Sequence, residues 1–286
     1  MDFALPTYDM TETMFPLSRH TPTPYEQRQI DAIKAWRASP PGLIERASGV
    51  ALSPISHLIS SLMPASAIEA LLRASDWMAG QTMPGSTPAA DGIALEELDT
   101  DARAVRNWAV AYASGEGAVA GAVGLVSLPV ELPAIIALSL RTVRRIGVTY
   151  GYHGASERER QFVYAVLSVA SANSAQQKRT ALEALRGVET QKLARNWAIL
   201  GERAARRGVR AEAMVLFARD VAEQLGLNLS KRKALAALPV IGAAIGATVN
   251  GWYMRDIAAA AQRTYQQRWL EDRGLFAEDN QSADIS

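Results

Sequence analysis

The chain has 286 residues, of which 49% are apolar, 7% aromatic and none cysteine, and its formal net charge is +1. The apolar content excludes a disordered chain, and the lack of cysteine excludes disulfide scaffolds, thiol nucleophiles and cysteine-ligated zinc. The three histidines, His20, His57 and His153, have no second ligand at helical spacing, so we expect neither a metal site nor a cofactor.

The net charge is a cancellation between segments of opposite sign. Residues 1–101 carry −7, 102–191 carry +4, 192–233 carry +6 and 234–286 carry −2. A basic middle is typical of a protein that meets an anionic partner such as a phospholipid surface; alternatively, the acidic ends neutralise it in the fold. Because the chain opens without a basic region before an apolar run, we expect a cytoplasmic protein, peripheral on the inner membrane.

The first predicted helix follows a tail. Residues 1–22 mix prolines with polar residues and show no sustained periodicity, which indicates a flexible segment. Thr23 and Glu26 have the spacing of a capping box, with Pro24 at the first helical position. The helix that follows carries an apolar stripe of Ile30, Ile33 and Trp36.

The rest of the chain also has helical periodicity. Glycines and prolines in residues 80–98 predict an internal loop, and a helix is expected from Thr100 onward. Later helices are predicted from three apolar stripes: Val105, Trp108 and Tyr112; Phe162, Val163, Val166 and Leu167; and Met214, Phe217, Val221 and Leu225. No run alternates with the two-residue period of a strand. We therefore predict an all-α fold, a single compact multi-helix domain over residues 23–273 with a C-terminal tail over 274–286.

Two segments, 117–140 and 234–254, are rich in glycine and alanine and nearly free of charge. Prolines divide them into helices of about 18 to 22 Å, shorter than the roughly 30 Å of a bilayer core. We predict two central helical hairpins, packed closely through Gly117, Gly121, Gly242 and Gly246. The alternative is that the hairpins are seated on a membrane surface, with flanking arginines reaching lipid phosphates.

These segments carry motifs that resemble the EcsC protein family. The matching stretches are the glycine-rich run 115–125, Glu131-Leu132-Pro133, 140–146, Tyr150-Gly151-Tyr152, 157–160, 238–246, Asn250 and 252–257. The resemblance covers residues 25–270, which favours one domain, and departs from the family where Glu131 replaces the usual aspartate. It implies a bacterial protein related to an operon that encodes an ABC transporter and affects secretion and regulated proteolysis, so a membrane transporter is an expected partner.

The polar residues within and beside the apolar segments are the candidate site. A cleft lined by Glu131, Arg141, Asn250 and Asp256 would suit a lipid headgroup or a hydrolytic reaction. Alternatively, the same residues form structural hydrogen bonds and ion pairs.

Basic residues beside these segments are the candidate contacts for anionic lipid. They are Arg144, Arg145, Arg203, Arg206, Arg207, Arg210, Lys231, Arg232 and Lys233. Without an aromatic platform or a known binding module beside them, we do not expect nucleic acid as the partner.

The leading hypothesis is a non-catalytic accessory factor that associates with a membrane or binds lipid, and no catalytic residue is assigned. One alternative is a soluble helical domain that holds a small apolar ligand in an internal cavity. Another is an unrecognised hydrolase using Glu131 or Asp256, although the chain contains none of the standard catalytic motifs.

Overall fold

The computed structural model describes residues 21–40, 92–123, 128–153, 157–172, 174–189 and 242–276. These residues form α-helices and no strand, which confirms the all-α class. The helices are α1 (Pro24–Ala38), α5 (Leu95–Val123), α6 (Leu128–Thr149), α7 (Glu157–Ser171), α8 (Ala175–Glu189) and α11 (Gly242–Asp272).

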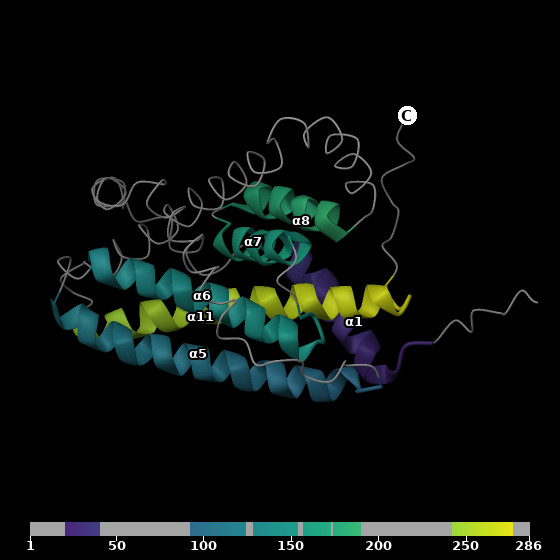
Figure 1. Ribbon diagram of the computed structural model, residues 1–286, viewed down its shortest axis with the longest axis horizontal. Helices are drawn as coiled ribbons and strands as arrows, with labels where there is room; N and C mark the ends of the chain where they lie inside the picture. Colours follow the sequence, from purple (N-terminus) through teal and green to yellow (C-terminus); the bar gives the residue numbers. More distant parts are fainter. Residues whose placement is uncertain are drawn as a thin grey trace, which may run out of the picture.

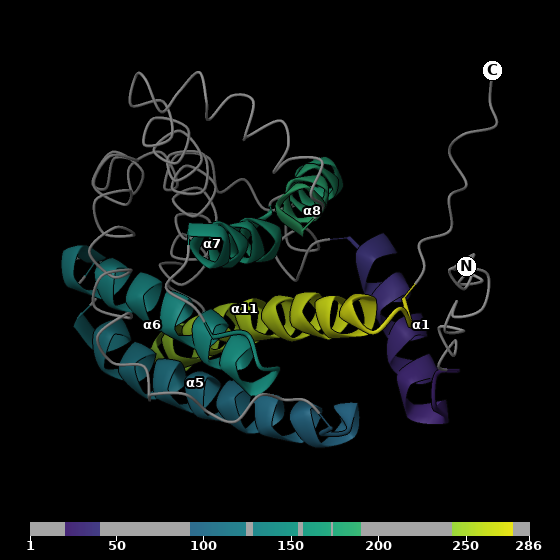
Figure 2. The ribbon, with the colours of Figure 1, turned by 45° about the vertical axis from the view of Figure 1, so that its right-hand side comes forward.

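The long helices α5, α6 and α11 lie side by side and form one layer (Figure 1). Helix α7 packs on α6 and α11, and α8 packs on α7, so these two form a second layer above the first (Figure 2). Helix α1 crosses near one end of α11 and contacts α5 and α11. The core lies where α5, α6, α7 and α11 meet.

Helix α1 begins as its sequence predicts. The Glu26 backbone N–H donates to Thr23 Oγ1 at 3.2 Å, and the Thr23 N–H donates to Glu26 Oε2 at 2.7 Å, which completes the capping box. Ile30 and Ile33 are buried in the main core, and Trp36 packs against a smaller cluster of Val169, Ala181 and Leu182.

Helix α5 begins at Leu95, five residues before the predicted start, so the end of the predicted loop over 80–98 is wrong. The N–H groups of Glu97 and Leu98 both donate to the Ala94 carbonyl, at 3.1 and 3.3 Å. Leu95 and Leu98 are buried, because their spacing places them on the same face as the core residues of the next turns. The part of this loop over 80–91 lies outside the described residues.

The core face of α5 is made of alanine. Ala102, Ala109 and Ala113 are fully buried, whereas Trp108 and Tyr112 are 43% and 47% exposed. The predicted stripe therefore shares one face, as expected, but this face points largely to solvent. Small side chains line the core face because α11 approaches closely: a Cβ atom on Gly251 would overlap Ser114 Oγ.

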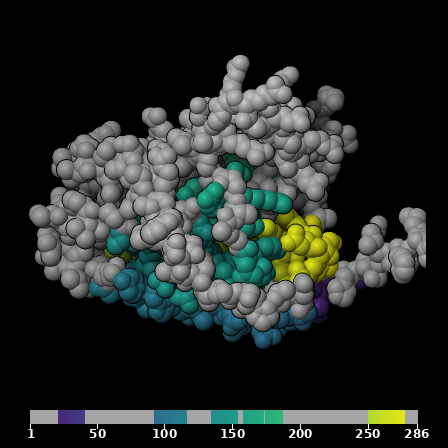
Figure 3. Space-filling view, in the orientation of Figure 1, coloured from purple at the N-terminus to yellow at the C-terminus, as the bar shows by residue number. Residues whose placement is uncertain are grey.

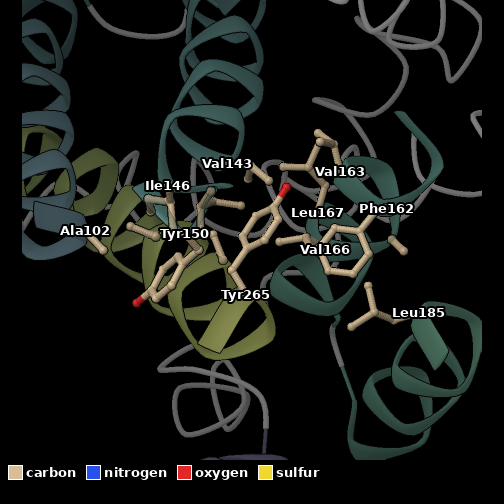
Figure 4. Packing of buried hydrophobic residues seen from close by; sticks show 14 of the residues in the cluster. Ala102, Val143, Ile146, Tyr150, Phe162, Val163, Val166, Leu167, Leu185 and Tyr265 are labelled. Atoms are coloured by element: carbon tan, nitrogen blue, oxygen red, sulfur yellow. The ribbon is translucent and has the colours of Figure 1, made fainter. Parts of the chain in front are cut away.

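The predicted stripe of α7 is confirmed as core, since Phe162, Val163, Val166 and Leu167 are all buried. Tyr265 of α11 lies at the centre of this core, between Tyr150 and Phe162 (Figure 4). The centroids of the Phe162, Tyr152 and Tyr150 rings lie 4.9, 5.6 and 6.4 Å from that of Tyr265. A Cβ atom on Gly147 would lie 2.6 Å from Tyr265 Cζ. Glycine at this position is what allows α6 to pack directly on the tyrosine ring.

The two glycine-rich segments are only partly described. The first runs through the end of α5 into α6, which pack against each other, and residues 124–127 between them lie outside the described part. The second is described from Gly242, where α11 begins, and its predicted break at Pro239 lies outside. Gly117 and Gly121 are in α5, and Gly242 and Gly246 in α11, two helices that pack together; the hairpins themselves stay predictions. The predicted stripe over 214–225 also lies outside the described residues.

The packed domain extends beyond the predicted boundary at residue 273. Leu275 and Phe276 are each 8% exposed and belong to the main core, although the sequence predicted a tail from 274. Gly274 has a φ of +68°, and the Leu275 N–H donates to the Leu270 carbonyl at 2.9 Å. A glycine in the left-handed region after α11 turns the chain back, and this turn returns the two apolar side chains to the core.

Lys178 of α8 stabilises the C-terminal end of α1. Its Nζ donates to the Trp36 carbonyl and, at 2.8 Å, to the Ser39 carbonyl, and it lies 4.7 Å from the centroid of the Trp36 ring. The side chain is buried, and burial lowers the pKa of its ammonium group from 10.5 to about 8. Both acceptors are neutral, so the charge is held by hydrogen bonds and by the ring.

We expect Lys178 to make stability increase with pH above neutrality. Between pH 8 and pH 10.5 the unfolded chain keeps the proton that the folded chain has lost, so unfolding becomes less favourable as pH rises. Across this window, the free energy of unfolding of wild type should rise by about 2 to 3 kcal/mol relative to that of Lys178→Met. Urea denaturation of both proteins at pH 7, 8, 9 and 10 measures it; a difference that stays constant with pH would contradict the lowered pKa.

Candidate functional site

The residues of the predicted polar site differ in how far their side chains are exposed. Arg141 is exposed on α6, whereas Asn250 is 4% exposed in α11. Asp256 is half-buried on α11, and the side chain of Glu131, in the first turns of α6, lies outside the described part. A cleft that joins all four residues therefore stays a prediction.

Arg144 and Arg145 point to different surroundings. Arg145 is exposed, like Arg141 one turn before it. Arg144 is 8% exposed, and burial lowers the pKa of its guanidinium group. This burial removes Arg144 from the surface on which its neighbour lies. The other predicted lipid contacts lie outside the described residues: Arg203, Arg206, Arg207, Arg210, Lys231, Arg232 and Lys233.

Two aromatic side chains of α5 and two arginines of α6 form a surface that we call the aromatic–arginine patch: Trp108, Tyr112, Arg141 and Arg145. The two rings are stacked, with centroids 5.4 Å apart and an interplanar angle of 19°. The guanidinium carbons of Arg141 and Arg145 lie 5.9 and 5.4 Å from the Trp108 centroid. One exposed indole therefore contacts two cations and a second ring.

The helical period explains why the patch forms. Trp108 and Tyr112 are four residues apart on α5, and Arg141 and Arg145 are four apart on α6, so each pair occupies one face of its helix. Packing of α5 on α6 then brings the two faces together. Helix α5 lies open along the lower edge of the molecule in the space-filling view (Figure 3). A cation over an exposed ring contributes only about 0.5 to 1 kcal/mol, so the fold does not depend on this patch.

A buried carboxylate, which the sequence analysis did not single out, joins four elements of the fold. Asp99 of α5 is 1% exposed. Its Oδ2 accepts from the Tyr25 hydroxyl at 2.7 Å, and its Oδ1 accepts from the Tyr150 hydroxyl at 2.5 Å and from Gln266 Nε2 at 2.7 Å. These donors belong to α1, to the turn after α6, and to α11.

The donors to Asp99 are neutral groups. Burial and the neighbouring carboxylate raise the pKa of the Tyr150 phenol, and burial followed by the hydrogen bond to Asp99 raises that of Tyr25. Both phenols therefore stay protonated and keep donating. With almost no exposed surface, Asp99 has no room for a substrate, and its role is to hold α1, α5, α6 and α11 together.

An ion pair joins α7 to α11. Arg268 Nη2 and Nη1 donate to Glu159 Oε1 and Oε2 at 2.6 and 3.1 Å, and each side chain is 13% exposed. The Arg268 guanidinium carbon also lies 4.0 Å from the Tyr152 centroid and 4.8 Å from that of Phe162. This pair is structural, since both carboxylate oxygens are taken by one guanidinium fork.

The described residues offer neither a membrane-crossing helix nor a cluster of metal ligands. None of their helices is both long and apolar enough to cross a membrane. Their acidic and histidine side chains form no cluster of three that could hold a metal ion.

The fold and the aromatic–arginine patch define an all-α protein in which α5 and α6 together present exposed aromatic and cationic side chains. The chain belongs to the EcsC protein family, whose model matches residues 27–270 and so confirms the resemblance noted in the sequence. A curated relative, the uncharacterized protein YdbA of Bacillus subtilis (strain 168), is 29% identical over 163 residues, which are 56% of this chain and 54% of that protein. The chain thus spans about half the length of this relative. No solved structure matches the chain.

Proposed function

We propose that this EcsC-family protein is a peripheral membrane protein that places its aromatic–arginine patch on an anionic lipid surface. The observation that carries the proposal is the stack of Trp108 and Tyr112, 43% and 47% exposed, with Arg141 and Arg145 over the indole. Tryptophan and tyrosine favour the headgroup region of a bilayer, because one end of each ring is apolar and the other polar. Arginines beside them supply the charge that attracts lipid phosphates.

In this proposal the protein acts as a non-catalytic accessory factor on the cytoplasmic face of the membrane, with a membrane transporter as a partner. Surface adsorption requires no membrane-crossing helix. It requires exposed rings at the level of the headgroups and cations that reach the phosphates, and the patch offers both on adjacent helices. The alternatives of an internal apolar ligand and of hydrolysis by Glu131 or Asp256 stay predictions, since no observation on the described residues favours them.

Replacing both patch arginines tests the proposal. Arg141→Gln/Arg145→Gln should weaken binding to vesicles of equimolar phosphatidylcholine and phosphatidylglycerol by about 30-fold, since each basic residue near such a surface contributes about 1 kcal/mol. Trp108→Ala/Tyr112→Ala should weaken binding as well and make the remainder more sensitive to salt. Flotation of the full chain with the vesicles at low salt measures both effects.

The matched control is Arg28→Gln/Arg179→Gln, which removes two charges from exposed positions on α1 and α8. Arg28 lies over Tyr25 at 5.5 Å and thus also loses an arginine–aromatic contact. The control should bind nearly as tightly as wild type. Equal losses of vesicle binding in Arg141→Gln/Arg145→Gln and in the control would show that only net charge matters. A wild-type protein that does not bind the vesicles at low salt would refute the proposal.

A further inference from the structure

A second basic cluster lies where α5 packs on α11, and we call this contact the seam. Arg103 and Arg106 belong to α5, and Arg255 and Arg263 to α11. Arg103 and Arg255 are exposed, and the other two are half-buried. None of the four contributes to the aromatic–arginine patch.

The pairing of α5 with α11 brings these arginines together. Asp99 bonds to Gln266, and Ser114 meets Gly251, so the two helices are antiparallel in a register that places Arg106 beside Ala259. Residue 259 is midway between Arg255 and Arg263, which are two helical turns, or about 12 Å, apart along α11. Arg103 lies one turn from Arg106 on the same side of α5. Two guanidinium groups from each helix therefore line one seam.

The four arginines of the seam all carry positive charge. Burial lowers the pKa of Arg106, and the positive charges of Arg255, Arg103 and Arg263 lower it further. Among the described residues, the hydrogen-bond acceptors of Arg103 and Arg263 are neutral. Arg103 Nε donates to the Asp99 carbonyl at 3.0 Å, and Arg263 Nη1 donates to Gln29 Oε1 and Gln266 Oε1 at 2.9 Å.

These neutral contacts fix the positions of two guanidinium groups without neutralising them. Repulsion within such a cluster disfavours the folded state unless an anion offsets it. Guanidinium groups suit phosphate because their planar forks donate in pairs to its oxygens. Two anchored arginines and two less constrained ones thus offer several guanidinium donors along one seam to an anion of high charge.

We propose that the seam formed by Arg103, Arg106, Arg255 and Arg263 binds a multiply charged phosphate group, either on a soluble phosphate compound or on a lipid headgroup that ends in a phosphomonoester. Both sources present the same chemistry, a terminal phosphate with up to two negative charges. Trp252 is 44% exposed and lies one turn from Arg255, so a lipid headgroup bound here would bring this ring near the bilayer surface. The site is separate from the proposed membrane patch and does not depend on it.

Inorganic pyrophosphate and phosphatidic acid vesicles are the two probes. We expect the full chain to bind at least one of them, and Arg106→Gln/Arg255→Gln to weaken that binding about tenfold or more. Calorimetric titration with pyrophosphate at low salt measures the soluble arm. Flotation with phosphatidic acid in phosphatidylcholine, against phosphatidylglycerol at equal surface charge, measures the lipid arm. Preference for phosphatidic acid without pyrophosphate binding assigns the site to a lipid, and the reverse assigns it to a soluble phosphate.

Two control variants separate this site from net charge and from the membrane patch. Arg28→Gln/Arg179→Gln and Arg141→Gln/Arg145→Gln should both leave pyrophosphate binding within about twofold of wild type. Without ligand, Arg106→Gln should raise or leave unchanged the melting temperature, because it relieves repulsion, whereas a structural arginine would lower it. The inference is overturned if wild type binds neither probe, or if the seam and control variants lose binding equally.

Discussion

Asp99→Ala is expected to lower the free energy of unfolding by about 3 to 5 kcal/mol, the largest effect of any single substitution considered for this protein. The carboxylate is 1% exposed and accepts hydrogen bonds from Tyr25, Tyr150 and Gln266. Its removal leaves three donors from three elements without an acceptor in a buried site, and each such donor costs about 1 to 3 kcal/mol. Urea denaturation monitored by circular dichroism measures the loss.

Smaller changes at the same site should have graded effects. Asp99→Asn keeps the volume and one acceptor oxygen, so its loss should lie between those of wild type and Asp99→Ala. Tyr25→Phe removes one of the three donors and should cost about 1 kcal/mol. A loss below about 1 kcal/mol for Asp99→Ala would show that the network is not a main support of the fold.

Arg268→Ala is expected to lower the free energy of unfolding by about 3 kcal/mol, the second largest effect. The substitution takes the bidentate partner from Glu159 at a site where both side chains are 13% exposed. It also removes the guanidinium group from the faces of Tyr152 and Phe162, where it lies 4.0 and 4.8 Å from the centroids. The same denaturation experiment measures the loss.

Two variants separate charge from packing at this pair. Arg268→Lys keeps the charge but loses the fork and the planar contact with the rings, so it should recover only part of the loss. Arg268→Met/Glu159→Met removes both charges and fills most of the volume, and it should be less destabilised than Arg268→Ala. If Arg268→Met/Glu159→Met is less stable than Arg268→Ala, the ion pair itself stabilises the fold, and the loss in Arg268→Ala is not only the cost of leaving Glu159 without a partner.

Local patterns were sufficient to predict parts of this fold. The capping box at Thr23 and Glu26 depends on residues three apart, so the start of α1 could be predicted without knowledge of its surroundings. The stripe of α7 is a run of large apolar side chains, and only burial accommodates such a run.

The face of α5 could not be inferred in the same way. Hydrophobic periodicity favours the face with the largest apolar side chains, which here holds Trp108 and Tyr112. The helix instead buries Ala102, Ala109 and Ala113, because the close approach of α11 leaves room only for small side chains. The exposure of these rings depends on the packing of α11 against the opposite face of α5, which the sequence of α5 alone does not specify.

The buried carboxylate of Asp99 could not be predicted either, because its contacts are with residues distant in the sequence. Asp99 stands among other acids at residues 96–101 and has the local pattern of a solvated helix start. Its donors are 74, 51 and 167 residues away in the chain. The motif Tyr150-Gly151-Tyr152 is visible in the sequence, but no periodicity within one helix connects it with Asp99. The arginine seam was missed for the same reason, since it exists only in the register of α5 against α11.

The pairing of α5 with α11 also sets the order in which the chain can fold during synthesis. Asp99 and Gln266 are 167 residues apart, so the ribosome must add all of that sequence before α11 can cover the alanine face of α5. At about 5 to 20 residues per second, this delay is on the order of ten seconds. A pairing of such high contact order is also slow to form. We expect the nascent chain to present the uncovered α5 during this interval, which makes α11 the element that completes the core late in translation.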